Sequence, residues 1–351
     1  TFSKNLTSEN DITIYARSNN SGGVEVYEKD GTTKIADFGT IGEDKEYKIY
    51  LTNLTTPGDT FDLKAIGGDV EYDYVVDPPL SACGTISSAG VYTLTANISG
   101  TGTCININTS DVTLDCAGFG ITSDGTGTGI AASSRINITI KNCVLNNLTF
   151  GIDLTFTNSS LVLNNSINVS GSSGIGIRAT RLINVTIANN SINSQYKGIE
   201  IYDDPKNTTI QGNVINSTSQ AIHILGFTTL GATGNRILNN VVNSTESYAI
   251  HTESHTQEII ANNTCVSTGA FSGIRVNNGA NNVIESNTCS NIGTGYGIVV
   301  IEEEADIIRF NSANSTGGSG LALDGATTTN ANVTNNVLIS STGDGLLVGG
   351  G

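Results

Sequence analysis

Ionisable side chains recur at one position of a repeated sequence motif. Each repeat contains a Gly-Ile or related dipeptide, and in six consecutive repeats the next residue is ionisable. Successive residues of a strand point to opposite faces, so this column lies outside the protein if the Ile or Leu points inward. Carboxylates and imidazoles on one face can exchange protons with a substrate, and arginines can hold an anion. The six residues are Asp153, Arg178, Glu200, His223, His251 and Arg275.

Two interpretations of this column compete. As a catalytic face, it offers Glu200, His223 and His251 as acid–base candidates, with Arg178 and Arg275 as candidates for holding a sugar carboxylate. As a structural face, its first three residues alternate in charge sign and favour the correct stacking of neighbouring repeats. We favour the structural interpretation and predict no catalytic residue.

Two short patterns have the composition of metal ligands. His251, Glu253 and His255 are spaced two apart, so on one strand their side chains share a face. The run Glu302–Glu304 with Asp306 offers the oxygen ligands that calcium prefers. Short acidic patterns of this kind are usually solvated. We therefore predict neither a metal nor a cofactor.

The elements that must position these residues repeat every 22 to 28 residues. This period lacks the leucine-dense consensus of leucine-rich repeats and favours a β-solenoid. The dipeptide marker begins at Gly129, Gly151, Gly176, Gly198, Ala221, Ala249, Gly273, Gly297, Gly320 and Gly345.

A second marker is an asparagine in each repeat, followed two residues later by a residue that suits a core. Asparagine tolerates the left-handed conformation of a tight corner, and its amide can bond to its copy one repeat away. With a third short strand between the markers, each turn has three strands, which predicts three parallel sheets and an asparagine ladder. The ladder residues are Asn142, Asn165, Asn190, Asn213, Asn240, Asn263, Asn287, Asn311 and Asn336.

The first 80 residues follow a different pattern. They alternate apolar and polar residues between turn signals such as Lys29-Asp30-Gly31, which is typical of antiparallel strands. The fold prediction is therefore all-β. A small antiparallel β-sandwich spans residues 1–80, and a right-handed three-sheet parallel β-helix of about ten coils spans residues 81–351.

The repeats resemble those of the pectin-lyase-like superfamily, particularly the parallel β-helix proteins of microbial and archaeal cell surfaces. The segment that begins at Cys83, C-G-T-I-S-S-A-G-V-Y-T-L, looks like their entry coils. The resemblance implies that an enzyme of this fold would work from one sheet face. Polygalacturonases carry N-T-D, D-D, G-H-G and R-x-K motifs. Here Asp203-Asp204 precedes His223, but the other motifs are missing.

Composition limits the partners and the compartment. The net charge of −16 argues against nucleic acid and anionic membranes, and no apolar run is long enough to span a bilayer. We expect one disulfide within Cys83, Cys104 and Cys116, which suits an extracellular or cell-surface location. Cys265 and Cys289 occupy one repeat position and should stack in the core, either as free thiols or as a bridge between coils; we favour free buried thiols.

Asn-x-Ser/Thr sequons occur at 18 asparagines and predict N-linked glycans at some of them. The candidates are Asn5, Asn53, Asn97, Asn147, Asn168, Asn216, Asn243 and Asn314.

The functional prediction is a non-catalytic extracellular structural protein, a glycosylated cell-surface or filament subunit. The repeats stop one strand into a new coil, so we expect subunits to associate head-to-tail through their termini. The alternative is a polysaccharide lyase or hydrolase, or a sugar-binding module, that uses the outer face of one sheet.

Overall fold

The structure is a computed structural model of the 351-residue chain. It describes residues 80–227, 231–325 and 327–349, together with the backbone of seven earlier strands. These are β1 (Phe2–Asn5), β2 (Ile12–Ser18), β3 (Gly23–Glu28), β4 (Lys34–Thr40), β5 (Glu46–Leu51), β6 (Thr60–Ile66) and β7 (Val70–Val76).

The seven early strands pair mainly antiparallel, as their alternating sequence predicts. Strands β1, β6, β3 and β4 form a four-stranded sheet, and β5, β2 and β7 pair beside one another. Val76 of β7 then pairs parallel with Val91 of β9 (Gly90–Thr93). The pairing therefore changes from antiparallel to parallel where the repeats begin.

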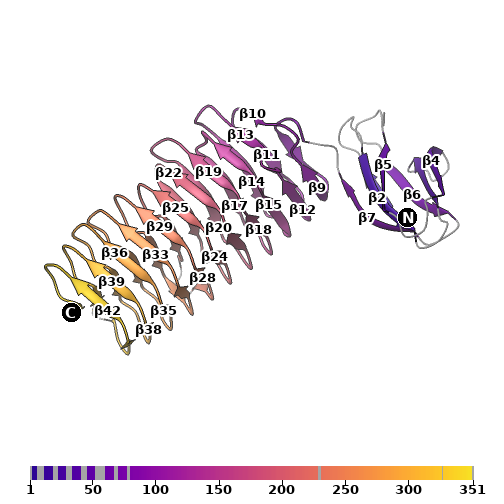
Figure 1. Cartoon of the computed structure of the whole chain (residues 1–351). Coiled ribbons are helices and arrows are strands. Elements are labelled where there is room, and N and C mark those ends of the chain that lie inside the picture. The colour runs from indigo at the N-terminus through magenta and orange to yellow at the C-terminus, as the bar shows by residue number, and fades with distance from the viewer. Residues whose placement is uncertain are drawn as a thin grey trace.

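From residue 80 onward the described chain winds into a parallel β-solenoid of about 11 turns with three sheets and no helix (Figure 1). The 12-stranded sheet contains β8 (Gly84–Ile86), β11 (Thr103–Ile107), β14 (Thr128–Ser133), β17 (Phe150–Thr155), β20 (Ile175–Thr180), β23 (Lys197–Tyr202), β26 (Ile222–Leu225), β30 (Ile250–Glu253), β34 (Ile274–Asn277), β37 (Ile298–Ile301), β40 (Leu321–Asp324) and β43 (Leu346–Val348).

The 11-stranded sheet contains β10 (Ile98–Ser99), β13 (Gly120–Thr122), β16 (Val144–Asn146), β19 (Ser166–Val169), β22 (Ser191–Ser194), β25 (Val214–Ser217), β29 (Val241–Ser244), β33 (Thr264–Ser267), β36 (Thr288–Asn291), β39 (Ser312–Ser315) and β42 (Val337–Ser340).

The 14-stranded sheet continues from β5, β2, β7 and β9. It adds β12 (Val112–Asp115), β15 (Ile138–Lys141), β18 (Leu161–Leu163), β21 (Thr186–Ala188), β24 (Thr209–Gln211), β28 (Arg236–Leu238), β32 (Ile259–Ala261), β35 (Val283–Glu285), β38 (Ile307–Arg309) and β41 (Asn332–Thr334). A two-stranded pair, β27 (Ala232–Thr233) and β31 (His255–Thr256), lies at one corner.

The dipeptide marker is explained by the narrow core. Its Ile or Leu is fully buried in each coil from Ile130 to Leu321. At Gly176 an added Cβ would lie 2.4 Å from the Ile192 side chain and 2.7 Å from the carbonyl oxygen of Gly198. The residue before the core Ile must therefore be small.

The two properties expected of the marker asparagine, ladder hydrogen bonds and a left-handed backbone, belong to two adjacent residues. Asn190 is buried: its backbone N–H and its Nδ2 donate to Asn213 Oδ1, at 2.9 and 3.0 Å. The left-handed conformation belongs to the preceding residue, such as Asn189 with φ 56°. The ladder has eight asparagines, which are Asn165, Asn190, Asn213, Asn240, Asn263, Asn287, Asn311 and Asn336.

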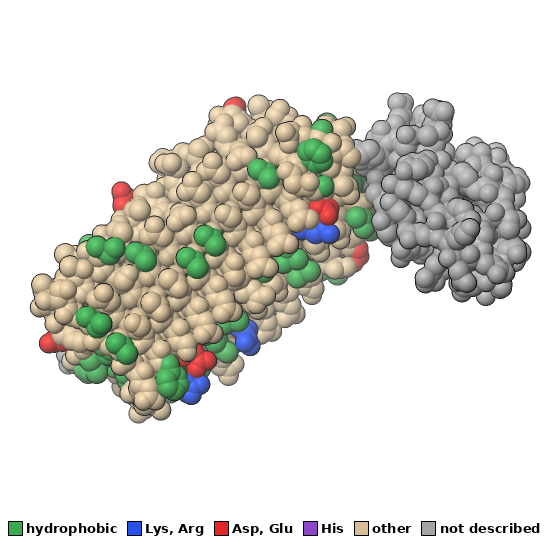
Figure 2. All heavy atoms as spheres, in the orientation of Figure 1, with side chains coloured by type: hydrophobic (Ala, Val, Ile, Leu, Met, Phe, Trp, Pro, Cys, Tyr) green, Lys and Arg blue, Asp and Glu red, His purple; other side chains and the backbone are tan. Residues whose placement is uncertain are grey.

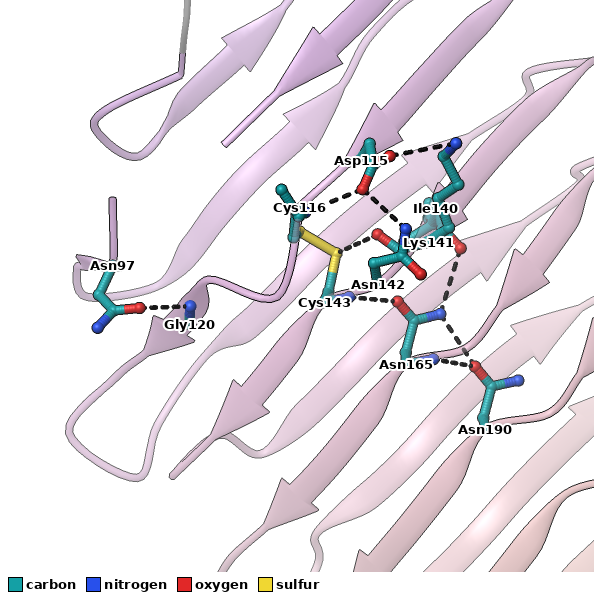
Figure 3. The surroundings of a disulfide bond; sticks show 11 residues. Asn97, Asp115, Cys116, Gly120, Ile140, Lys141, Asn142, Cys143, Asn165 and Asn190 are labelled. Carbon is teal, nitrogen blue, oxygen red and sulfur yellow. Dashed lines mark hydrogen bonds and ion pairs between the residues drawn. A yellow bond between two sulfur atoms is a disulfide. The ribbon is translucent and has the colours of Figure 1, made fainter. Parts of the chain in front are cut away.

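Asn142 was wrongly predicted as a ladder residue. It has φ 57° and therefore occupies the corner position, and its Nδ2 donates to Asp115. Cys143 takes the ladder place, and its backbone N–H donates to Asn165 Oδ1 at 3.0 Å (Figure 3). Because Cys143 is disulfide-bonded to Cys116, a disulfide joins the first coils where the ladder begins.

The cysteines form three disulfides, each between adjacent coils. Cys83 pairs with Cys104, within the predicted trio, but the third member, Cys116, pairs with Cys143. Cys265 and Cys289 are also bonded to each other, so the expectation of free thiols was wrong. Equivalent positions in neighbouring coils are about 4.8 Å apart, which brings two such cysteines within bonding reach.

Candidate functional site

The six ionisable residues of the repeated column lie one above another on the outer face of the 12-stranded sheet. Strand pairing aligns Arg178 with Asp153 on one side and with Glu200 on the other. The alignment continues from Glu200 through His223 and His251 to Arg275. The middle of this column, from Glu200 to His251, is nearly buried although it faces away from the core.

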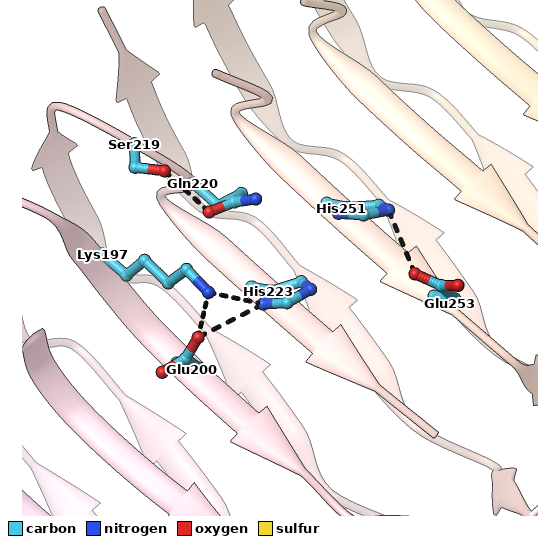
Figure 4. A network of polar contacts seen from close by, with 7 residues as sticks. All are labelled: Lys197, Glu200, Ser219, Gln220, His223, His251 and Glu253. Carbon is cyan, nitrogen blue, oxygen red and sulfur yellow. Dashed lines mark hydrogen bonds and ion pairs between the residues drawn. The ribbon is translucent and has the colours of Figure 1, made fainter. Parts of the chain in front are cut away.

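Lys197, Glu200 and His223 form a compact network on this face (Figure 4). Lys197 forms an ion pair with Glu200 Oε1, and its Nζ lies 3.2 Å from His223 Nδ1. His223 Nδ1 is 3.4 Å from the same Glu200 oxygen. Sequence reasoning missed Lys197, because period-two alternation places residues three apart on opposite faces. Lys197 begins β23, and its long side chain reaches back over the outer face to Glu200.

Glu200 is held as a carboxylate. Burial raises its pKa, but hydrogen bonds with His223, Lys197 and Tyr202 outweigh burial, and the net pKa is lowered. Tyr202 has its pKa raised by burial and by the neighbouring Glu200 charge. At neutral pH the network therefore contains an ionised acid beside a neutral phenol.

His251 extends the network by one coil. Its ring stacks on that of His223, with centroids 5.0 Å apart and planes 17° from parallel. Burial, with the neighbouring His223 and Arg275, lowers the pKa of His251 to about 3. His251 Nε2 lies 3.0 Å from Asn277 Oδ1, which assigns the proton to Nε2. The buried Nδ1 then has a free lone pair, and it has no hydrogen-bond partner in the described structure.

The two arginines differ in their partners. Arg178 forms an ion pair with Asp153 and lies over the Phe150 ring, with its guanidinium carbon 3.7 Å from the centroid. Arg275 donates to the Tyr248 hydroxyl at 2.6 Å. Among the described residues Arg275 forms no ion pair, and its buried Nε has no hydrogen-bond partner. Arg275 is therefore a cation available to a bound anion.

The two sequence patterns that could have bound a metal do not form metal sites, because in each pattern some side chains lie on the surface and others lie in the core. His255 does not share a face with His251 and Glu253, because Ser254 between them adopts φ 59° and turns the chain. His255 is fully buried. Glu302 and Glu304 are exposed, whereas Glu303 and Asp306 are buried.

No group of three His, Cys, Asp or Glu side chains in the described ranges is arranged to hold a metal ion. An open depression of about 530 Å³ lies at this corner, lined in part by Gly279, Ala280, Glu302 and Glu304.

The candidate glycosylation sites fall in several environments. Asn53 and the side chain of Asn5 lie outside the described residues. Asn97 and Asn147 use their side chains in hydrogen bonds to neighbouring coils. The remaining four point outward from the 11-stranded sheet, and they are Asn168, Asn216, Asn243 and Asn314.

Comparison with known families decides the classification of the repeats. The family model described as the right handed beta helix region matches residues 87–237 and 221–351. The chain belongs to the right-handed beta helix family. Solved structures support the β-helix fold at low sequence identity, and curated protein sequences gave no match.

Three β-helix structures illustrate this similarity. The Agl-KA catalytic domain is 12% identical, with 99% of this chain and 89% of that chain covered and a TM-score of 0.50. ORF18 of Geobacillus virus E2 is 13% identical, with 74% and 56% covered and a TM-score of 0.53. A double mutant of the periplasmic alginate epimerase AlgG is 12% identical, with 75% and 77% covered and a TM-score of 0.51. At these identities the beta helix chain shares their fold, and its chemistry must be argued from its own residues.

Proposed function

We propose that the outer face of the 12-stranded sheet binds an acidic polysaccharide and transfers a proton at one of its sugars. The observation that carries this proposal is the nearly buried Lys197–Glu200–His223 network on an outward-facing surface. Outer-face side chains are normally solvated, and clusters of buried ionisable groups are enriched at functional sites.

The chemistry of the face supports this substrate class. Lys197 Nζ and His223 Nδ1 are 3.2 Å apart beside the Glu200 carboxylate, so a proton can pass within the network. His251 stacks on His223 and so helps to hold that imidazole beside Glu200. Arg275 can pair with a sugar carboxylate. AlgG, which shares the β-helix fold, is an alginate epimerase.

Aromatic side chains on the same face suit a sugar ligand. Tyr248 lies against both His251 and Phe271, with ring centroids 4.8 and 5.0 Å away. Tyr202 meets His223 edge-on at 6.3 Å. Such rings offer apolar surfaces next to hydrogen-bonding groups, as in other ligand sites.

We expect the protein to depolymerise or epimerise an acidic polysaccharide, and Glu200→Gln and His251→Ala to lower kcat/KM at least about 100-fold. The measurement is a screen of acidic and neutral polysaccharides for reducing ends, unsaturated ends or epimerised sugars. Glu285→Gln is the matched control, because Glu285 forms a partly exposed ion pair with Arg309 on the 14-stranded sheet. Binding without any product would reduce the proposal to a sugar-binding module. No binding to any polysaccharide would refute it.

A second candidate is the non-catalytic, self-associating extracellular subunit. The observation that favours it is the outer face of the 11-stranded sheet, whose two outward columns from β13 to β42 contain no charged residue. Figure 2 shows a broad face of the β-helix with few charges and scattered apolar side chains. In a chain of net charge −16, this face is where a second copy meets least electrostatic repulsion.

We expect such association to appear as filaments or oligomers at high concentration, and Val241→Glu to shift it towards monomer. Val241 is 52% exposed on this face. Sedimentation velocity and electron microscopy of the native protein are the measurements. A protein that stays monomeric at millimolar concentration would exclude this candidate.

A further inference from the structure

Five polar residues lie inside the β-helix at one corner, and we name them the corner cluster. All are at most 1% exposed, although four of them are ionisable. They come from three consecutive coils: two from the coil of β30–β33, one from the next, and two from the coil of β37–β39. The members are His255, Glu258, Asn282, Glu303 and Asp306.

Asn282 stands at the centre of the corner cluster. Its Nδ2 donates to Glu303 Oε2 at 2.9 Å, and its backbone N–H donates to Asp306 Oδ1 at 2.8 Å. His255 Nδ1 lies 3.3 Å from Asn282 Oδ1 and 3.4 Å from Glu258 Oε2. The cluster is thus one connected unit that joins three coils.

Gly279 makes room for the Glu303 side chain. A Cβ at position 279 would lie 2.9 and 3.1 Å from the two Glu303 carboxyl oxygens. Gly279 also lines the open depression outside this corner, next to the exposed Glu302 and Glu304. Gly279 therefore lies next to both the Glu303 carboxyl and the open depression, which brings solvent close to the cluster.

The corner cluster lacks enough partners for three charges. Both oxygens of Glu258, Oε1 of Glu303 and Oδ2 of Asp306 have no hydrogen-bond partner in the described structure, and neither does His255 Nε2. Among the described residues, the only ion pair to these carboxyls is that of His255 with Glu258. Three carboxylates in a dry core would repel one another and lose their hydration, so at least one must be neutral.

We propose that the corner cluster is a pH-sensitive latch, which keeps its three coils closed while its carboxyls hold protons and lets them open at alkaline pH. Burial, with the charges of Asp306 and Glu258, raises the pKa of Glu303 to about 9. Burial raises the pKa of Asp306 to about 6 and also raises the pKa of Glu258. The facing groups are His255 and Glu258 from one side and Glu303 and Asp306 from the other.

The sign of the pH dependence follows from these raised pKa values. Below about pH 4.5, Glu303 is protonated in both the folded and the unfolded chain, and the latch contributes fully. Between about pH 4.5 and 9, the unfolded chain releases this proton and the folded chain retains it, so stability falls as pH rises. Asp306 adds a smaller loss between about pH 3.8 and 6.

The test is hydrogen exchange and thermal melting of the whole chain from pH 5 to pH 9. After correction for intrinsic exchange rates, we expect protection of β32, β35 and β38 to fall at least about 10-fold relative to β15, β18 and β21. Glu303→Gln keeps the shape without the charge, so it should abolish most of this fall and melt above wild type at pH 9. Glu304→Gln, an exposed neighbour, should follow wild type.

Three outcomes would overturn the latch. The first is a wild-type profile in which the three coils keep their protection to pH 9. The second is a Glu303→Gln protein whose profile runs parallel to wild type. The third is restoration of alkaline protection by millimolar calcium in wild type, because a cation would then balance the carboxyls. If Glu303→Gln does not fold, Asp306→Asn is measured in its place. It should also reduce the alkaline loss of protection.

Discussion

Replacement of Asn213 by alanine is expected to lower the free energy of unfolding by about 3–5 kcal/mol. Asn213 Oδ1 accepts from the backbone N–H and from Nδ2 of Asn190, and its own Nδ2 donates to the Ile187 carbonyl and to Asn240 Oδ1. Alanine leaves the Asn190 backbone N–H without this partner, at a cost of about 1–3 kcal/mol for a buried unpaired group. It also removes one hydrogen bond each from Asn190 Nδ2, the Ile187 carbonyl and Asn240 Oδ1, at about 1 kcal/mol for each bond. The measurement is urea unfolding followed by circular dichroism.

Asn216→Ala is the matched control for the ladder. Asn216 lies three residues further along, on β25, and its side chain points outward and is exposed. We expect its loss to change stability by less than about 0.5 kcal/mol. Equal effects of the two substitutions would show that the ladder hydrogen bonds are not what holds the coils in register.

The second large effect is expected when one member of the buried ion pair is removed. The Glu200 side chain is only 1% exposed, and Lys197→Met removes the cation that pairs with its carboxylate. Breaking a buried pair on one side costs about 3–5 kcal/mol, because the remaining charge is uncompensated. Thermal and urea unfolding of the Lys197→Met protein measure this loss.

The double variant Lys197→Met with Glu200→Leu separates the pair from simple loss of packing. An apolar replacement of both partners removes the uncompensated charge, so most of the stability should return. Lys141→Met serves as the control, because Lys141 pairs with Asp115 at 3.1 Å and is 36% exposed. Its effect should stay below about 1 kcal/mol. A double variant no more stable than the single one would show that the pair itself is not the source of the loss.

The register of the β-helix was predictable from sequence because it depends on local, repeated signals. The small residue and the core Ile or Leu recur in each coil, and strand alternation then assigns the next residue to the outer face. This reasoning correctly aligned Glu200 with His223 and His251 on neighbouring strands. It did not show that these residues are nearly buried there, because their burial depends on side-chain contacts such as the stacking of His251 on His223 between coils.

The corners were less predictable. Strand alternation stops wherever a residue adopts the left-handed conformation, so the direction of the following side chain no longer follows from the pattern. Ser254 is such a residue, and His255 after it enters the core instead of joining His251. The prediction for Asn142 was wrong because the corner residue and the ladder residue are neighbours in sequence and either can be asparagine. In this coil Asn142 is the corner residue, and Cys143 after it occupies the ladder place.

The sequence alone determined the repeat length, the three-strand coil and the column of ionisable residues, because each rests on residues close together in the chain. Only the tertiary structure decided which groups meet between coils. Lys197 and His223 are 26 residues apart, and Asn282 and Glu303 are 21 apart, yet each pair is in contact. Such contacts depend on the stacking of coils and on side chains that turn at the corners, which local periodicity does not specify.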